Sequence, residues 1–239
     1  MNSYKEYIKT LEDNSYLISM VPIEELLRFG YEAGLTPNSK VLDLCCGYGT
    51  VLKVWSEAFG ISGIGVDRDA GFISIGNERL KKAAIESVKL VCEDVTTYQD
   101  DEKYDVVICS ETIGSICDTL SLGEKFLKKD GIIAYQKLYS KVVNPPKELV
   151  EFDGEVLPLS KLNQIFNEAG YYMISMASDT DNAWERYVIN WSGKNDINRL
   201  RENPSDTGLK EWIDKWYTMY FDYRRQYEGQ ALFGLQRMS

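Results

Sequence analysis

The sequence predicts an α/β protein with a doubly wound, mostly parallel sheet of seven strands, and three observations support this fold class. Short apolar segments alternate with segments of helical periodicity along residues 36–140, as in repeated strand–helix–strand units. Residues 41–50, VLDLCCGYGT, are a continuous apolar segment followed by a glycine turn, which is typical of a buried parallel strand. A chain of 239 residues is also a common length for one such domain with an insertion.

The predicted elements follow this alternation from the N-terminus onward within one domain, 1–239. Residues 1–35 form an N-terminal helical segment, in which Pro22 suits a first turn and Gly34 a helix end. The predicted strands are 40–44, 62–66, 88–92, 105–109, 132–136, 171–177 and 231–237. The predicted helices between them are 50–59, 71–85, 120–127 and 159–169, with a proline-bearing loop at 144–158.

Residues 178–229, between the last two predicted strands, are too many for a turn and are expected to form a helical lid insertion. Aromatic and apolar residues recur at helical spacing from Leu209 onward, and a shorter helix is expected to begin near Asn182 and to be separated from the later one by residues 203–205 (NPS). A lid at the ligand end of a sheet excludes water from a reactive site. Trp184 and Tyr187 are the candidates for lining a substrate pocket. In the alternative interpretation, these aromatic residues pack the insertion onto the sheet or form a dimer contact. The second case would make the protein a homodimer.

Two predicted strands end near a carboxylate, Asp43 before the glycine turn and Asp67 after the second strand. Open α/β sheets bind ligands at the carboxyl ends of their strands, so these two side chains should flank one pocket. Each feature alone has an ordinary structural interpretation. Gly47 and Gly49 suit any tight turn, Asp67 suits a helix N-cap, and Asp94 suits a turn before a threonine. Their joint occurrence at strand ends favours a ligand site.

The turn distinguishes two cofactor classes. Dinucleotide sites continue as Gly-x-Gly-x-x-Gly and receive an anionic pyrophosphate, but Leu52 stands at the third glycine position and Asp43 would repel a diphosphate. S-adenosylmethionine has no phosphate, its ammonium and sulfonium suit a carboxylate, and Asp67 is placed to accept hydrogen bonds from its ribose. We therefore expect S-adenosylmethionine as the cofactor. The alternatives are a catalytically silent S-adenosylmethionine- or S-adenosylhomocysteine-binding protein, an NAD-dependent oxidoreductase, and a spermidine-synthase-like transferase.

Four segments in order resemble the motifs of class I S-adenosylmethionine-dependent methyltransferases: 43–49 (DLCCGYG), Asp67, 92–95 (CEDV) and 104–109 (YDVVIC). This resemblance implies a Rossmann-like fold with a cofactor-binding half at 36–140. In that family the residue matched by Asp94 meets the adenine amino group, and the residue matched by Val95 packs on the ring. Cys45 departs from the family, which usually has glycine there, and this reduces backbone freedom at positive φ. The cofactor-binding residues implied are Asp43, Cys45, Gly47, Gly49, Asp67, Arg68, Glu93, Asp94, Val95 and Ser110.

A looser resemblance extends over nearly the whole chain. Residues 135–139 (YQKLY) with Pro145 and Pro146, residues 184–187 (WERY) and residues 229–234 (GQALFG) are similar to a bacterial subgroup of small-molecule methyltransferases with a helical insertion before the last strand. The resemblance implies a small-molecule methyl acceptor.

The reaction implied is an in-line attack on the sulfonium methyl, in which the protein supplies position and electrostatics. An amine or thiolate acceptor needs no strong base, whereas a hydroxyl or carbon acid does. The chain has no histidine, so the base would be a carboxylate or a tyrosinate. Glu111, which follows the fourth predicted strand, is the first candidate for this base. Its alternative roles are a charge at a helix start and a contact to the cofactor.

Composition sets the remaining expectations. The formal charge of −10 and the pI near 4.7, without a basic run, make nucleic acid an unlikely partner. No basic-then-apolar leader and no apolar run of membrane length is present, so a cytoplasmic protein without a membrane partner is expected. The five cysteines lack the paired C-x-x-C spacing of a zinc site, and the absence of histidine removes His-based triads and ligands. No metal is expected.

Overall fold

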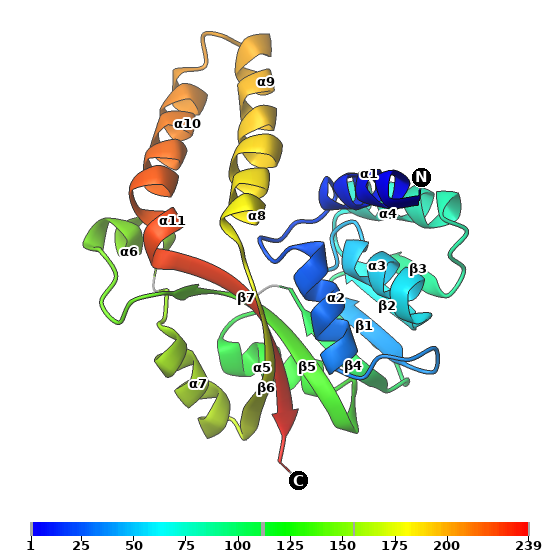
Figure 1. Cartoon of the computed structure of the whole chain (residues 1–239). Coiled ribbons are helices and arrows are strands. Elements are labelled where there is room, and N and C mark those ends of the chain that lie inside the picture. Colours follow the sequence, from blue (N-terminus) through cyan, green and yellow to red (C-terminus); the bar gives the residue numbers. More distant parts are fainter. Residues whose placement is uncertain (1, 111–112, 155, 239) are drawn as a thin grey trace.

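The computed structural model describes residues 2–110, 113–154 and 156–238. Its centre is a seven-stranded sheet in the order β3-β2-β1-β4-β5-β7-β6 (Figure 1). The strands are β1 Lys40–Leu44, β2 Ser62–Asp67, β3 Val88–Cys92, β4 Tyr104–Cys109, β5 Leu127–Ser140, β6 Tyr171–Ser178 and β7 Glu228–Arg237. β7 runs antiparallel to both β5 and β6, whereas the other neighbours are parallel. The predicted fold class is confirmed.

Both faces of the sheet are covered, because successive residues of each central strand point to opposite sides. Val41 packs with Phe29 and Trp55 in one apolar core, whereas Leu42 packs with Phe166 in the other. The helices on the first face are α2 Ile23–Glu32, α3 Thr50–Phe59 and α4 Ala70–Lys82. The helices on the second face are α5 Ile116–Glu124 and α7 Leu159–Glu168.

Helix α1 Asn2–Asn14 lies over α3 and α4 near the end of the sheet (Figure 1). Asp13 holds it there, because its buried carboxylate pairs with Lys53 at 2.9 Å and with Arg79 at 2.8 Å. Within the described residues, no helix has the length and apolar character needed to cross a bilayer.

The insertion between β6 and β7 is a helical hairpin, Asp181–Tyr227, whose two arms stand beyond the end of the sheet (Figure 1). Its elements are α8 Asp181–Glu185, η1 Arg186–Gly193, α9 Lys194–Glu202, α10 Thr207–Met219, η2 Tyr220–Arg224 and α11 Arg225–Tyr227. Both η segments are π-helices, a wider winding that is frequent at functional sites. The two π-helices belong to opposite arms of the hairpin. The arms also meet where Trp184 of α8 stacks on Tyr220 of η2, with ring centroids 6.1 Å apart.

Several predicted elements have other bounds in the structure. The helix predicted at 120–127 begins four residues earlier, at Ile116, where Ser115 and Asp118 form a capping box. The proline-bearing loop contains a further helix, α6 Lys147–Asp153. The helix expected to begin near Asn182 runs through α8, η1 and α9 to Glu202, and it ends directly before residues 203–205, as predicted.

The turn from β1 to α3 brings the backbone into an unusual conformation. Gly47 and Gly49 have φ values of 53° and 65°, and a Cβ on Gly49 would lie 2.6 Å from Leu90 Cδ2. Leu52, at the position of a third dinucleotide glycine, is fully buried. The close approach of α3 to the sheet is allowed instead by Gly63, where a Cβ would lie 2.9 Å from Leu52 Cδ2.

Cys45 has a φ of 64°, in the left-handed region where an L-residue is strained by about 1–2 kcal/mol. We expect Cys45→Gly to raise the free energy of unfolding by about 0.5–1 kcal/mol, because the released strain exceeds the entropic cost of glycine. Denaturant unfolding measures the change. Cys46→Gly is the matched control and should lose stability, because Cys46 Sγ packs closely against Gly65. A less stable Cys45→Gly protein would contradict the strain at this position.

Candidate functional site

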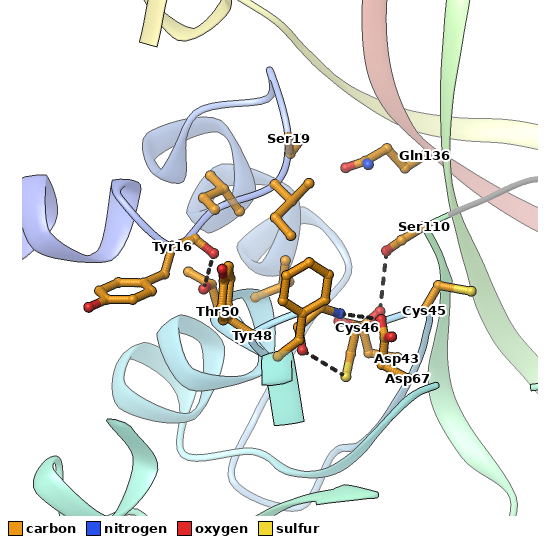
Figure 2. Close-up of a pocket in the computed structure, with 15 residues that line it drawn as sticks. Tyr16, Ser19, Asp43, Cys45, Cys46, Tyr48, Thr50, Asp67, Ser110 and Gln136 are labelled. Atoms are coloured by element: carbon orange, nitrogen blue, oxygen red, sulfur yellow. Dashed lines mark hydrogen bonds between the residues drawn. The ribbon is translucent and has the colours of Figure 1, made fainter. Parts of the chain in front are cut away.

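Three adjoining cavities lie at the carboxyl ends of the strands. The central cavity is bounded by the β1–α3 turn and by the segment after α1 (Figure 2). It shares Cys45 and Asp67 with the β2–β3 cavity, and it shares Ile18, Ser110 and Gln136 with the hairpin cavity under the insertion. The three cavities therefore adjoin one another along a path from β3 to the hairpin.

Asp67 lies at the end of β2 between the central and β2–β3 cavities. Its Oδ2 accepts a hydrogen bond from the Gly47 amide at 2.8 Å, and its Oδ1 accepts one from the Asp69 amide at 2.9 Å. The helix cap considered for Asp67 is supplied by Asp69, which accepts from the Gly71 and Phe72 amides at the start of α4. Each Asp67 oxygen keeps lone pairs for further donors, as a ribose diol would require.

Asp43 lies at the end of β1 and is only 1% exposed. It lines the central cavity, and the Ser110 hydroxyl donates a hydrogen bond to its Oδ1 at 3.3 Å (Figure 2). The pKa of Asp43 is raised to about 8, mainly by burial; the Ser110 hydrogen bond acts to lower it, and the nearby Asp67 acts to raise it. A buried carboxyl group with a single long hydrogen bond is a strong acceptor for a cation.

The raised pKa of Asp43 makes stability depend on pH. The folded protein keeps this proton up to about pH 8, and the unfolded chain releases it near pH 4, so the contribution is complete below pH 4 and is lost as the pH rises to about 8. We expect Asp43→Asn to stabilise the free protein by about 1–3 kcal/mol at pH 8, because asparagine carries no charge to bury. The gain should shrink towards pH 4, as denaturant unfolding at both pH values would show.

Asp105→Asn is the matched control for this measurement. Desolvation acts to raise the pKa of Asp105, but hydrogen bonds from the Lys128 side chain and the Lys40 amide outweigh it and lower the pKa. This carboxylate therefore stabilises the protein above its unfolded pKa, and its replacement should cost stability at pH 8. If Asp43→Asn behaved like Asp105→Asn, the carboxyl group at position 43 would not be held in a desolvating site.

The β2–β3 cavity has a volume of about 420 Å³ and is lined by Arg68, Asp94 and Val95 among others. Asp94 Oδ1 accepts hydrogen bonds from the Thr96 amide and hydroxyl at 2.8 and 2.7 Å, which lowers its pKa. Asp94 therefore stabilises the turn before Thr96, as its sequence position suggested, and it also forms part of the wall of the β2–β3 cavity. Val95 is buried and gives this cavity an apolar surface. Glu93 does not line any of the three cavities.

Residues 16–19, which we call the N-terminal strap, form the outer wall of the central cavity. The Tyr16 carbonyl accepts a hydrogen bond from the Thr50 hydroxyl at 2.8 Å, and the Tyr16 ring lies under the Arg79 guanidinium at 4.2 Å. Ser19 donates to Gln230 Oε1 on β7 at 3.0 Å. The strap is therefore tied to α3, α4 and the sheet.

Arg186, on the hairpin, also holds the strap. Its guanidinium donates to the carbonyls of Asn14 and Leu17, both at 2.9 Å, and to the carbonyl of Ser19. Burial lowers the pKa of Arg186 to about 10. Sequence reasoning placed residues 184–187 in the lid but did not identify this role, because the partners are backbone carbonyls more than 150 positions earlier in the chain.

The hairpin cavity has a volume of about 220 Å³. Tyr187 lines it, whereas Trp184 does not. Trp184 is 1% exposed, and its indole N–H donates to Asp179, so it packs the base of the hairpin. Glu111, the candidate base, lies outside the described residues. The sequence did not identify the remaining wall residues as site residues, although four of them lie in segments 135–139 and 229–234 of the looser resemblance: Ile18, Met20, Gln136, Lys137, Leu138, Trp216, Arg224 and Gln230.

Within the described ranges, no group of three or more carboxylate or thiol side chains is arranged to hold a metal ion. The cysteines described there form no disulfide, and the Cys46 and Cys109 thiols have raised pKa values because of burial. A thiol with a raised pKa is a poor nucleophile and a poor metal ligand.

The comparisons with known proteins agree with this geometry. The model of the methyltransferase domain family matches residues 41–131, a range that contains the glycine turn, Asp67 and Asp94. The uncharacterized protein YjhP of Escherichia coli (strain K12) is 25% identical over 225 residues, which cover 89% of this chain and 90% of that protein. Phosphoethanolamine N-methyltransferase 1 of Arabidopsis thaliana is 26% identical over 172 residues, which cover 69% of this chain but 35% of the plant protein.

Solved structures resemble the whole chain. The SAM-dependent methyltransferase of Geobacter sulfurreducens, in complex with S-adenosyl-L-homocysteine, has a TM-score of 0.82 at 26% identity and covers 93% of this chain, with 94% of its own length matched. The corresponding enzyme of Thiobacillus denitrificans has a TM-score of 0.86 at 23% identity, with the same coverage of 93% and 94%. At that lower identity the second likeness shows the fold alone.

Proposed function

We propose that this chain, which is a class I S-adenosylmethionine-dependent methyltransferase, transfers the sulfonium methyl to a small molecule bound in the hairpin cavity. The observation that carries this proposal is the meeting of two cavities at Ser110 and Gln136. On one side of these residues lie the carboxyl groups of Asp43 and Asp67, and on the other lies the cavity under the hairpin. The hairpin cavity, at about 220 Å³, is smaller than pockets that hold drug-sized ligands.

The residues present fit the cofactor. Asp43, buried and nearly without donors, suits the cationic methionine end, and the free lone pairs of Asp67 suit the ribose hydroxyls. Val95 supplies an apolar wall for adenine, beside Asp94 and Arg68. Two carboxyl groups and a buried Leu52 disfavour a dinucleotide, which needs a glycine-rich approach to its pyrophosphate. These roles are our proposal for the cofactor-binding residues, together with Cys45, Gly47, Gly49 and Ser110, which line or shape the same turn.

S-adenosylmethionine supplies an electrophilic methyl group when it is bound. The protein holds the acceptor in line with that methyl, and such positioning lowers barriers by about 7–11 kcal/mol. The N-terminal strap and the hairpin exclude water from the junction at Ser110 and Gln136. An amine or thiol acceptor needs no strong base there. For a hydroxyl or a carbon acid, Tyr187 in the cavity wall and Glu111 are the candidate bases.

Calorimetry and a product assay test this proposal together. S-adenosylhomocysteine should bind at micromolar concentrations or tighter, NAD should not compete with it, and S-adenosylmethionine plus a panel of small metabolites should yield S-adenosylhomocysteine. Binding without product from any acceptor would favour a catalytically silent binding protein. Preference for NAD would favour an oxidoreductase. A cytoplasmic location and the absence of a nucleic-acid partner stay predictions from composition, and a homodimer is tested by the mass in solution.

A further inference from the structure

Among the described residues in the wall of the hairpin cavity, three polar side chains can only donate hydrogen bonds. The wall contains two cations, Lys137 on β5 and Arg224 on η2, and an indole N–H from Trp216 on α10. Among the described residues that line it, none is a carboxylate. The protein carries a formal charge of −10, so the described part of this wall, with two cations and no carboxylate, has the opposite sign of charge to the chain as a whole.

Arg224 is 4% exposed and lies between two indoles, with its guanidinium carbon 5.2 Å from the Trp184 ring and 4.8 Å from the Trp216 ring. Its Nε donates to Glu228 at 2.6 Å and lies 3.4 Å from Asp153. A guanidinium carries five N–H donors in a planar fork, and both of these contacts use Nε. Within the described part of the chain, its terminal amino groups make no recorded hydrogen bond, so the fork keeps donors for a ligand.

Trp216 provides a second, independent indication. Its Nε1 is buried and has no hydrogen-bond partner among the described residues. A buried donor left without a partner costs about 1–3 kcal/mol, and each such group in a native structure calls for an explanation. An acceptor atom of a ligand in the cavity that Trp216 lines would satisfy this N–H.

We propose that the methyl acceptor carries an oxyanion, a carboxylate or a phosphate, which binds Lys137, the Arg224 fork and the Trp216 N–H while its nucleophile faces Ser110 and Gln136. This inference rests on the proposed methyltransferase function and adds the chemical class of its substrate. The two ends of the path then have complementary charge: carboxyl groups receive the cationic cofactor, and cations receive the anionic acceptor. The aromatic side chains of Tyr187 and Trp216 provide flat apolar walls beside the anion site.

Binding of model anions to the S-adenosylhomocysteine complex tests the inference without knowledge of the true acceptor. Calorimetry would compare benzoate and phenyl phosphate with neutral benzamide and benzyl alcohol. At least one anion should bind about tenfold or more tightly than both neutral probes, because charge-assisted hydrogen bonds are about twice as strong as neutral ones. Tighter binding of benzoate would identify a carboxylate acceptor, and tighter binding of phenyl phosphate would identify a phosphate acceptor.

Two variants link the anion preference to the cavity. Lys137→Gln and Trp216→Phe should each weaken anion binding by about threefold to tenfold, with binding of S-adenosylhomocysteine unchanged. Lys129→Gln, an exposed lysine at the far end of the same strand, is the matched control and should bind the anion normally. Equal binding of anions and neutral probes, or an anion preference that both variants retain in full, would overturn the inference. Failure to bind S-adenosylhomocysteine would instead overturn the proposed function.

Discussion

Replacing Asp67 with alanine is expected to weaken binding of S-adenosylhomocysteine by about 100-fold, or ~2.7 kcal/mol. Asp67 stands between the central and β2–β3 cavities, where a carboxylate can accept from both ribose hydroxyls. Hydrogen bonds to a charged group contribute about 1.5–3 kcal/mol each. Asp67→Asn keeps an acceptor for the Gly47 amide and loses the charge, so an intermediate loss of about tenfold is expected. Calorimetric titration of each variant measures the effect.

Asp69→Ala is the matched control for this experiment. Asp69 lies two residues away and caps α4 through the Gly71 and Phe72 amides, but it does not line any of the three cavities. Its loss should cost about 1 kcal/mol of stability and leave the affinity nearly unchanged. Equal affinities for Asp67→Ala and the unaltered protein would contradict the assignment of the ribose site, whatever the stability of the variant.

Replacing Arg224 with methionine is expected to lower the free energy of unfolding by about 3–5 kcal/mol, because removal of one partner leaves a buried charge uncompensated. The Glu228 side chain is fully buried and the Asp153 side chain nearly so. Burial already raises the pKa of both carboxyl groups, and Arg224 opposes this shift in both, together with Lys141 in the case of Glu228. Without Arg224 the pKa values should rise further, and the loss of stability should grow as the pH increases from 5 to 8.

Arg225→Met is the neighbouring control. Arg225 is exposed and pairs with Glu185 at 3.0 Å on the surface, so its loss should cost less than about 1 kcal/mol. Denaturant unfolding of the two variants at pH 5 and pH 8 gives the comparison. A similar small cost for both variants would mean that the Arg224 cluster does not hold the hairpin to the sheet.

The cofactor half was predictable from sequence because its signals are local. Strands β1 and β3 have the boundaries expected from their apolar runs, and β4 begins one residue earlier. Asp43 and Asp67 lie at the ends of neighbouring parallel strands, with Asp43 paired to Gly65 in the register. Topology alone therefore brings the two carboxyl groups to one cavity.

The acceptor side was not predictable to the same extent, because distant segments build it. The hairpin cavity combines residues of the strap, β5, both hairpin arms and β7. Helical spacing identified an aromatic face in the insertion, but it did not distinguish Trp184, which packs at the base, from Trp216, which lines the cavity. Tyr187 and Arg224, which line the cavity, lie in the two π segments, and these segments have no signature in residue periodicity.

The β5 boundary shows a related effect. Strand β5 extends over Leu127–Ser140, well beyond the 132–136 predicted from its apolar run. Its second half pairs with β7, from Gln136 opposite Leu232 to Ser140 opposite Glu228. This pairing with the end of the chain brings Gln136 and Lys137 to the cavities. No local pattern indicates it, because the partner strand lies about 90 residues away.

A crystal structure of the complex with S-adenosylhomocysteine tests the central claim most directly. The account predicts adenine against Val95 and Asp94, the ribose hydroxyls on Asp67, the amino group of the homocysteine moiety near Asp43, and the sulfur facing Ser110 and the hairpin cavity. A nucleoside bound outside the central and β2–β3 cavities, or one whose sulfur faces away from the hairpin cavity, would contradict it.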